Sequence, residues 1–340
     1  MTLNTTGAIS FGGTDPSRSI NAQFLRGSSA KLSLGMLYQG GGIVPAGTPQ
    51  NANVPTSGRI SLGSLRGASR RRVLRVTYTE NTLQAILNLP AIPDYLSGST
   101  DLVVYVNPGV YVYSDAITVA GLTLLGGAPG DTVTVENHGF IIGRGGNGGG
   151  GPNTGGHGQA GGPALSLTGL SGIPTTVLNQ AGAYIAGGGG GGAGNGSGNG
   201  GGGGGGAGGG WGGQGIAGGA PGQRGADSGA RTGRGGGGGR ILPGDGGAAA
   251  NPNNNYNAIG GGAGGGGGNN RFSGFAGGNG GSANGNGAGP QERYAASGGG
   301  GWAATSGSTW DGYVSGAGGA AILRSHTINL INNGVIYGAV

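Results

Sequence analysis

The sequence predicts a mainly β and irregular protein in which a small β-rich base carries a packed bundle of polyglycine II helices. Three observations lead to this fold class: 97 of the 340 residues are glycine, only 8% are charged, and short apolar strands flank the glycine tracts. Globular proteins contain roughly 7% glycine and disordered ones usually carry many charges, so neither class describes this chain. Collagen is excluded because runs such as residues 235–239 are uninterrupted glycine and break the Gly-X-Y period.

Residues 1–69 are expected to form an N-terminal attachment arm or domain. Short alternating runs at residues 8–11, 30–34 and 59–62 are separated by Gly, Pro, Asn and Ser. This pattern is typical of brief strands in an extended segment. Such an arm needs a partner surface to become ordered.

A β-rich base is expected over residues 70–142. Residues 70–78 have the composition of a strand. Residues 80–89 place three apolar side chains at helical spacing before Pro90, which predicts one short helix. Further strands are expected at residues 102–106, 110–113 and 117–125.

A diverged repeat of strand, Asn-containing turn and strand is the most informative feature of the organisation. The copies are residues 133–143, 176–187 and 328–338, with turn glycines Gly139, Gly182 and Gly334. Each copy is interpreted as a β-hairpin. The first two run into glycine tracts and the last lies in residues 327–340, so the three hairpins are expected to lie together at the base of the glycine region.

Residues 143–326 are expected to be the polyglycine II domain. Without side chains, extended threefold helices can pack closely and bond backbone N–H groups to neighbouring carbonyls. Polar and aromatic insertions then become loops at the ends of the bundle. A flexible tail is the alternative, and the C-terminal repeat argues against it because the chain returns to its base.

Catalytic chemistry is not indicated. The chain has no cysteine and three histidines, and the acids of the glycine region are isolated from one another: Asp227, Asp245, Glu292 and Asp311. No nucleophile triad, metal cluster or paired-carboxylate site follows from such a set. The sequence therefore predicts no enzyme, no cofactor and no metal.

The basic run Arg70-Arg71-Arg72 with Arg75 raises nucleic acid as a partner. Arginine–glycine segments that bind RNA carry denser arginines interleaved with aromatics, so a charged strand edge or subunit contact is the preferred interpretation. No apolar stretch long enough to span a membrane and no signal peptide are found, which predicts synthesis in the cytoplasm without membrane insertion.

Aromatic side chains that interrupt the glycine tracts are the binding candidates, because a polyglycine lattice has no apolar interior to hide them. With nearby charged residues they suit sugar faces or protein loops. Coverage of the lattice sides or a subunit contact is the alternative, above all for Trp211. The receptor-binding candidates are Tyr256, Arg271, Phe272, Phe275, Arg293, Tyr294, Trp302, Trp310, Asp311 and Tyr313.

Residues 133–150, VTVENHGFIIGRGGNGGG, together with the closing INLINNGVIYG, resemble glycine-rich domains of bacteriophage tail-fibre and tail-tip proteins. The resemblance is to T-even-like tail-fibre tip adhesins, and it implies an attachment domain, a sandwich of polyglycine helices and variable host-binding loops. The N-terminal ISFGG and RSIN segments look like the opening of phage tail proteins. They supply the tail-attachment candidates Ile9, Phe11, Arg18, Ile20 and Asn21.

The expected function is that of a virion tail tip or fibre protein that docks to the tail and recognises a host receptor. Its expected partners are other tail, baseplate or fibre proteins and a host surface protein or polysaccharide, and a homo-oligomer stays open. A purely structural plug or spacer of the tail is the first alternative. A glycine-rich bacterial surface protein is the second, and the missing signal sequence argues against it.

Overall fold

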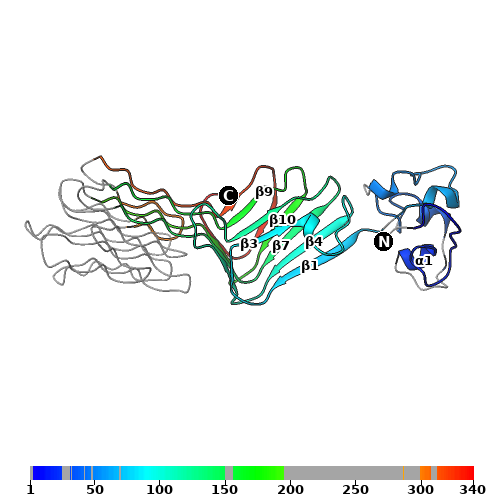
Figure 1. The fold of residues 1–340 in the computed structure, drawn as a ribbon, viewed down its shortest axis with the longest axis horizontal. Coiled ribbons are helices and arrows are strands. Elements are labelled where there is room, and N and C mark those ends of the chain that lie inside the picture. The colour runs from blue at the N-terminus through cyan, green and yellow to red at the C-terminus, as the bar shows by residue number, and fades with distance from the viewer. Residues whose placement is uncertain are drawn as a thin grey trace, which may run out of the picture.

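The computed structural model describes residues 3–24, 31, 33–41, 43–46, 49–68, 70–149, 156–194, 286, 299–307 and 312–340. An N-terminal module lies at one end of the molecule, a stack of β-strands occupies the middle, and glycine segments extend from the other side of the stack (Figure 1).

The N-terminal module has its own apolar core. One short helix, α1 (Ile20–Gln23), begins where the Ser19 hydroxyl accepts a hydrogen bond from the Ala22 N–H at 3.2 Å. Three 3-10 turns follow at Leu34–Leu37, Pro49–Asn51 and Leu62–Leu65. The buried side chains are Leu3, Ile20, Leu37, Val44, Val54, Leu65 and Ala68. The described part of residues 3–68 contains isolated bridges but no strand.

Three parallel sheets form the middle of the molecule, and every paired strand in them runs parallel to its neighbours. The first sheet contains β1 (Arg72–Tyr78), β4 (Thr100–Val106), β7 (Thr132–Asn137), β10 (Thr175–Asn179) and β13 (Asn329–Asn332). The second contains β2 (Thr82–Leu83), β5 (Tyr111–Tyr113), β8 (Phe140–Ile142), β11 (Tyr184–Ala186) and β14 (Val335–Tyr337). The third contains β3 (Ala85–Asn88), β6 (Leu122–Leu125), β9 (Leu165–Gly169) and β12 (Ile322–Leu323).

Successive strands along the chain belong to successive sheets, so the chain winds into a three-sided solenoid. Alternating residues of β4 are buried, which is the period-2 pattern of a strand with one face on a core. Inward side chains of the three sheets meet in one apolar cluster, and their repeated register stacks valine on valine, as at Val104 and Val135. The core therefore continues from one turn of the chain to the next.

The helix expected over residues 80–89 is wrong, because this segment is β2 and β3. Gln84 separates the two strands in the left-handed region, at φ 48°. Leu83 and Ile86, which suggested a helix face, are 45% and 59% exposed. Pairing of Ala85 with Leu122 in the adjacent turn overrides the local spacing.

The expected hairpins are also wrong. The repeat copies contain β7 with β8, β10 with β11, and β13 with β14, but the two strands of a copy lie in different sheets. Each strand pairs in parallel with the same strand of the neighbouring copy, so that Asn137, Asn179 and Asn332 stand in register. The turn that was interpreted as a hairpin loop is a corner of the solenoid.

The predicted fold class is therefore overturned. The described residues contain fourteen strands in three parallel sheets and a single short α-helix, and they show no bundle of polyglycine II helices on a hairpin base. The repeat is the winding unit of the solenoid itself. The described glycine segments are insertions into its turns.

Candidate functional site

The described glycine segments all leave the solenoid at the same corner, between the second and third sheets. We call residues 143–149, 156–164, 187–194, 299–307 and 312–320 the glycine block. One excursion starts after β8 and ends at β9, and another starts after β11 and ends at β12. Figure 1 shows these segments running away from the side of the solenoid to which the N-terminal module is attached.

Hydrogen bonds between backbones hold the block together. Every third N–H of one segment bonds to the next segment, as in Gly146 to the Gly189 carbonyl at 2.8 Å and Gly149 to the Gly192 carbonyl at 2.7 Å. Residues 187–194 also bond residues 156–164, with Gly191 N–H donating to the Gln159 carbonyl at 2.8 Å. Successive residues of one segment thus bond to different neighbouring segments. Buried backbone N–H and C=O groups find hydrogen-bond partners in this way without forming a β-sheet.

The segments approach too closely for side chains. A Cβ added to Gly158 would lie 1.7 Å from the carbonyl oxygen of Gly191, and one added to Gly188 would lie 1.8 Å from that of Arg144. Real Cβ atoms do not approach backbone oxygen to such distances, so glycine is required at these inward positions. The backbone itself fills the interior of the block.

A stack of aromatic rings joins the block to the solenoid. Val112 and Ile141 of the second sheet belong to the inner core, so their neighbours Tyr111 and Phe140 lie on the outer face. The stacked ring pairs, with centroid distances, are Tyr111–Phe140 at 4.6 Å, Phe140–Tyr184 at 4.2 Å, Tyr184–Trp302 at 4.6 Å and Trp302–Tyr337 at 5.0 Å. Burial here raises the pKa of Tyr184 well above its ordinary value, so the phenol is neutral.

Two of the receptor-binding candidates lie in the described residues, and the structure places them apart. Trp302 belongs to this aromatic stack and is 5% exposed. Tyr313 lies at the far end of the block, where its ring packs edge-on against His157 at 5.6 Å and the Val314 N–H donates to Nδ1 of His157 at 2.9 Å. The others lie outside the described residues: Tyr256, Arg271, Phe272, Phe275, Arg293, Tyr294, Trp310 and Asp311.

The sequence interpretation missed the tyrosines of the stack. Phe140, Tyr184 and Tyr337 each occur in the second strand of a repeat copy, and the first two directly precede a glycine tract. That shared position was the available signal, since rings in successive turns of a solenoid lie above one another.

The tail-attachment candidates divide into buried and exposed residues. Ile20 and Asn21 are 0% and 2% exposed and belong to the interior of the N-terminal module. Ile9 is half-buried against the same core. Phe11 is 45% exposed, and the side chain of Arg18 is 71% exposed with Asp15 at 3.8 Å. Phe11 and Arg18 can therefore contact another protein directly.

Three arginines of the basic run have acidic partners. Arg71 bonds Asp101 at 2.6 Å, and Arg72 lies 3.6 Å from Asp94. Arg75 lies 3.6 Å from Glu136 and covers the ring of Tyr105 at 4.4 Å from its centroid. The Arg71–Asp101 pair joins neighbouring turns of the solenoid, and Arg75 in β1 reaches across β4 to Glu136 in β7.

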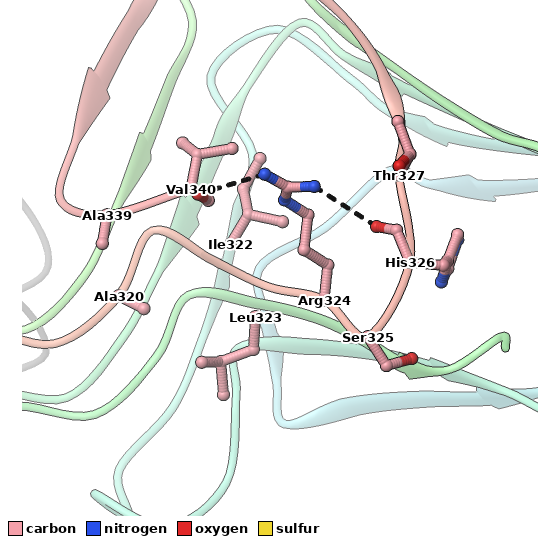
Figure 2. A pocket seen from close by; sticks show the side chains of 9 residues that line it. All are labelled: Ala320, Ile322, Leu323, Arg324, Ser325, His326, Thr327, Ala339 and Val340. Carbon is pink, nitrogen blue, oxygen red and sulfur yellow. Dashed lines mark hydrogen bonds between the residues drawn. The ribbon is translucent and has the colours of Figure 1, made fainter.

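An open pocket of about 570 Å³ lies at the last turn of the solenoid, lined by Ala320, Ile322, Leu323, Arg324, Ser325, His326, Thr327, Ala339 and Val340 (Figure 2). The Arg324 guanidinium donates to the carbonyl oxygens of His326 at 3.3 Å and Val340 at 3.5 Å. The pocket lining contains no Asp or Glu side chain.

No group of three metal-ligating side chains occurs among the described residues. In the same part of the chain, no helix has the length and apolarity needed to cross a bilayer.

Comparisons with known proteins give two matches. The sequence model of a family described as "Phage tail fibre adhesin Gp38" matches residues 73–254. No curated protein matches. Among solved structures, the chain is similar to the crystal structure of the gp37-gp38 adhesin tip complex of the bacteriophage S16 long tail fiber, with a TM-score of 0.43 and 20% identity over 84% of this chain and 88% of that chain.

Proposed function

This chain belongs to the phage tail fibre adhesin Gp38 family, and we propose that its glycine block presents the host-binding surface while its N-terminal module joins it to the fibre. The matched residues make up more than half of the chain, so it is a phage tail fibre adhesin of the virion tail. The experiments below test the separate roles of the two ends, host binding by the glycine block and fibre attachment by the N-terminal module.

One observation carries the proposal. All described glycine segments leave one corner of the solenoid and run away from the N-terminal module (Figure 1). The stretches that connect them, residues 150–155, 195–298 and 308–311, start and end at described residues of this far side, such as Gly149 and Gly194. Insertions placed there can vary without disturbing the solenoid, which suits a receptor-binding surface.

Binding of the purified, fluorescently labelled chain to host cells tests the receptor part. Replacing Phe272, Phe275, Trp310 and Tyr313 together by alanine should reduce cell binding by at least about tenfold, because aromatic anchors dominate binding surfaces. The matched control is Val73→Ala, a substitution at a residue that is 68% exposed on the solenoid. Unchanged binding by the fourfold variant would favour the structural spacer instead.

Fibre attachment is tested separately. Phe11→Ala with Arg18→Ala removes two exposed side chains of the N-terminal module and leaves its core in place. We expect phage particles carrying this variant to incorporate less adhesin while the purified chain still binds host cells. Normal incorporation would show that another surface makes the attachment.

The chemistry of both partners follows from these surfaces. The attachment partner is a fibre or tail protein, and the host partner is a surface protein or polysaccharide. No catalytic step enters the proposal, and neither does a metal or a cofactor.

A further inference from the structure

Residues 299–307 form an inward turn of the glycine block that touches the solenoid and leaves again. Gly300 N–H donates to the Gly190 carbonyl and Ala303 N–H to the Gly187 carbonyl, both at 2.8 Å, so the segment runs antiparallel to its neighbour. The Ala304 N–H then closes a turn on the Gly301 carbonyl at 3.1 Å. The chain returns outward, since Gly190 N–H donates to the Ala304 carbonyl at 3.0 Å.

Trp302 occupies the tip of this turn. Its ring contacts Tyr184 of β11 at 4.6 Å and Tyr337 of β14 at 5.0 Å, and these two tyrosine rings also meet edge-on at 6.4 Å. The side chain is 5% exposed, and its Nε1 has no hydrogen-bond partner among the described atoms. Ring stacking and burial, rather than a polar contact, therefore hold the indole in place.

The backbone beside Trp302 is strained. Ala303 has φ 52°, in the left-handed region that residues with a Cβ rarely adopt. Such a conformation persists only where the surrounding structure over-determines it. The contacts of the adjacent Trp302 ring with the aromatic stack hold Ala303 in this conformation.

The outward part of the turn, residues 304–307, links Trp302 to the segment at the far end of the block. Ser306 bonds residues 312–320 twice, since its N–H and its hydroxyl both donate to the Gly316 carbonyl at 3.1 Å. The Ser315 hydroxyl donates in return to the Gly307 carbonyl. The same returning segment carries Tyr313 against His157. A displaced turn would thus displace the edge on which Tyr313 lies.

We infer that Trp302 is a positioning residue for adhesion: it anchors the inward turn on the outer aromatic face of the second sheet and so fixes the Tyr313 edge of the host-binding surface. This inference rests on the proposed function. It also gives Trp302 a different role from direct receptor contact, because a 5% exposed ring cannot meet a receptor.

Trp302→Ala and Trp302→Phe in the full chain test the anchor. Trp302→Ala should lower host-cell binding by about tenfold and accelerate amide exchange at Gly300, Ala303 and Gly190. Exchange in β7 and β10 should stay unchanged. Trp302→Phe keeps a stacking ring and removes an N–H without a partner, so it should retain binding within about twofold.

Wild-type binding by Trp302→Ala, or an equal loss in Trp302→Phe, would overturn the anchor. If Trp302→Ala does not fold, Tyr337→Leu removes a second ring that contacts the indole and should give the same faster exchange at Gly300. Slow exchange there overturns the inference. Tyr313→Ala distinguishes failure of the Trp302 anchor from failure of the receptor-binding role of the Tyr313 edge. Loss of binding in Tyr313→Ala with normal binding in Trp302→Ala rejects the anchor alone, and normal binding in both rejects the receptor role of this edge as well.

Discussion

The solenoid and the glycine block solve the same packing problem by opposite means. In the solenoid, alternate side chains of the strands point inward and form one continuous apolar cluster between the three sheets. In the block, the segments lie so close that a Cβ at Gly316 would stand 2.0 Å from the carbonyl oxygen of Gln159. One interior is filled by side chains and the other by backbone.

The two regions therefore tolerate different kinds of substitution. A side-chain core loses stability when atoms are removed, because a cavity remains. A backbone interior loses stability when atoms are added, because the segments must separate and their hydrogen bonds break.

The largest expected effect comes from adding a side chain inside the block. Gly316→Val should lower the free energy of unfolding by more than about 4 kcal/mol, because the new Cβ overlaps Gln159 and breaks the Gly316 N–H bond to Gly191. Ala317→Val is the matched control at the next, exposed residue and should change it by less than about 0.5 kcal/mol. Urea denaturation of both variants measures the difference, and equal stabilities would mean that the block is not close-packed.

Removal of atoms from the solenoid core should have the next largest effect. Leu124 of β6 is fully buried, and Leu124→Ala is expected to lower the free energy of unfolding by about 2–5 kcal/mol. Ile86→Ala in the neighbouring β3 removes a side chain that is 59% exposed and serves as the control. Similar losses in the two variants would contradict an inward core on this side.

The asparagine ladder at one corner comes third. The Asn179 amide donates to the Asn332 side chain at 2.8 Å and accepts from Asn137 at 2.8 Å. Asn179→Ala removes the side-chain hydrogen bonds to both neighbouring turns and should lower the free energy of unfolding by about 1–3 kcal/mol. Asn332→Ala, at the exposed end of the ladder, should have a smaller effect in the same denaturation experiment. A reversed order would show that the ladder does not join the turns.

The smallest effect at neutral pH, and a visible one only in alkali, concerns buried tyrosines. Burial raises the pKa of Tyr78 and of Tyr95 to about 12. The folded state thus holds protons that the unfolded state releases near pH 10, so stability is constant below about pH 10 and falls as the pH rises through about 12. Phenolate absorbance should show late ionisation, and Tyr95→Phe should remove part of it. Normal titration of all tyrosines would contradict the buried positions.

Sequence reasoning identified the adhesin role and the repeat but not the winding of the chain. A strand, an Asn-containing turn that ends in glycine and a second strand fit a solenoid corner as well as a hairpin, because both need a sharp turn between apolar strands. The parallel register appears only when Asn137 and Asn179 are seen to stack. Long-range pairing of this kind leaves no signal inside a single copy.

The same limit explains Trp302. A tryptophan between glycines is expected to be exposed, because a lattice of glycine has no interior to receive it. The apolar site comes instead from the outer face of the second sheet, through Tyr184 and Tyr337. Contacts between an insertion and a distant strand follow from topology and not from local composition.

Backbone amide exchange of the isolated full chain tests the central claim most directly, because it compares the two interiors in one experiment. We expect slow amide exchange at Gly146, Gly191 and Gly316, whose N–H groups bond neighbouring segments, and also in the buried strands of the solenoid. Fast exchange at these glycines beside slow exchange in β4 and β7 would contradict a rigid glycine block as the support of the adhesive surface.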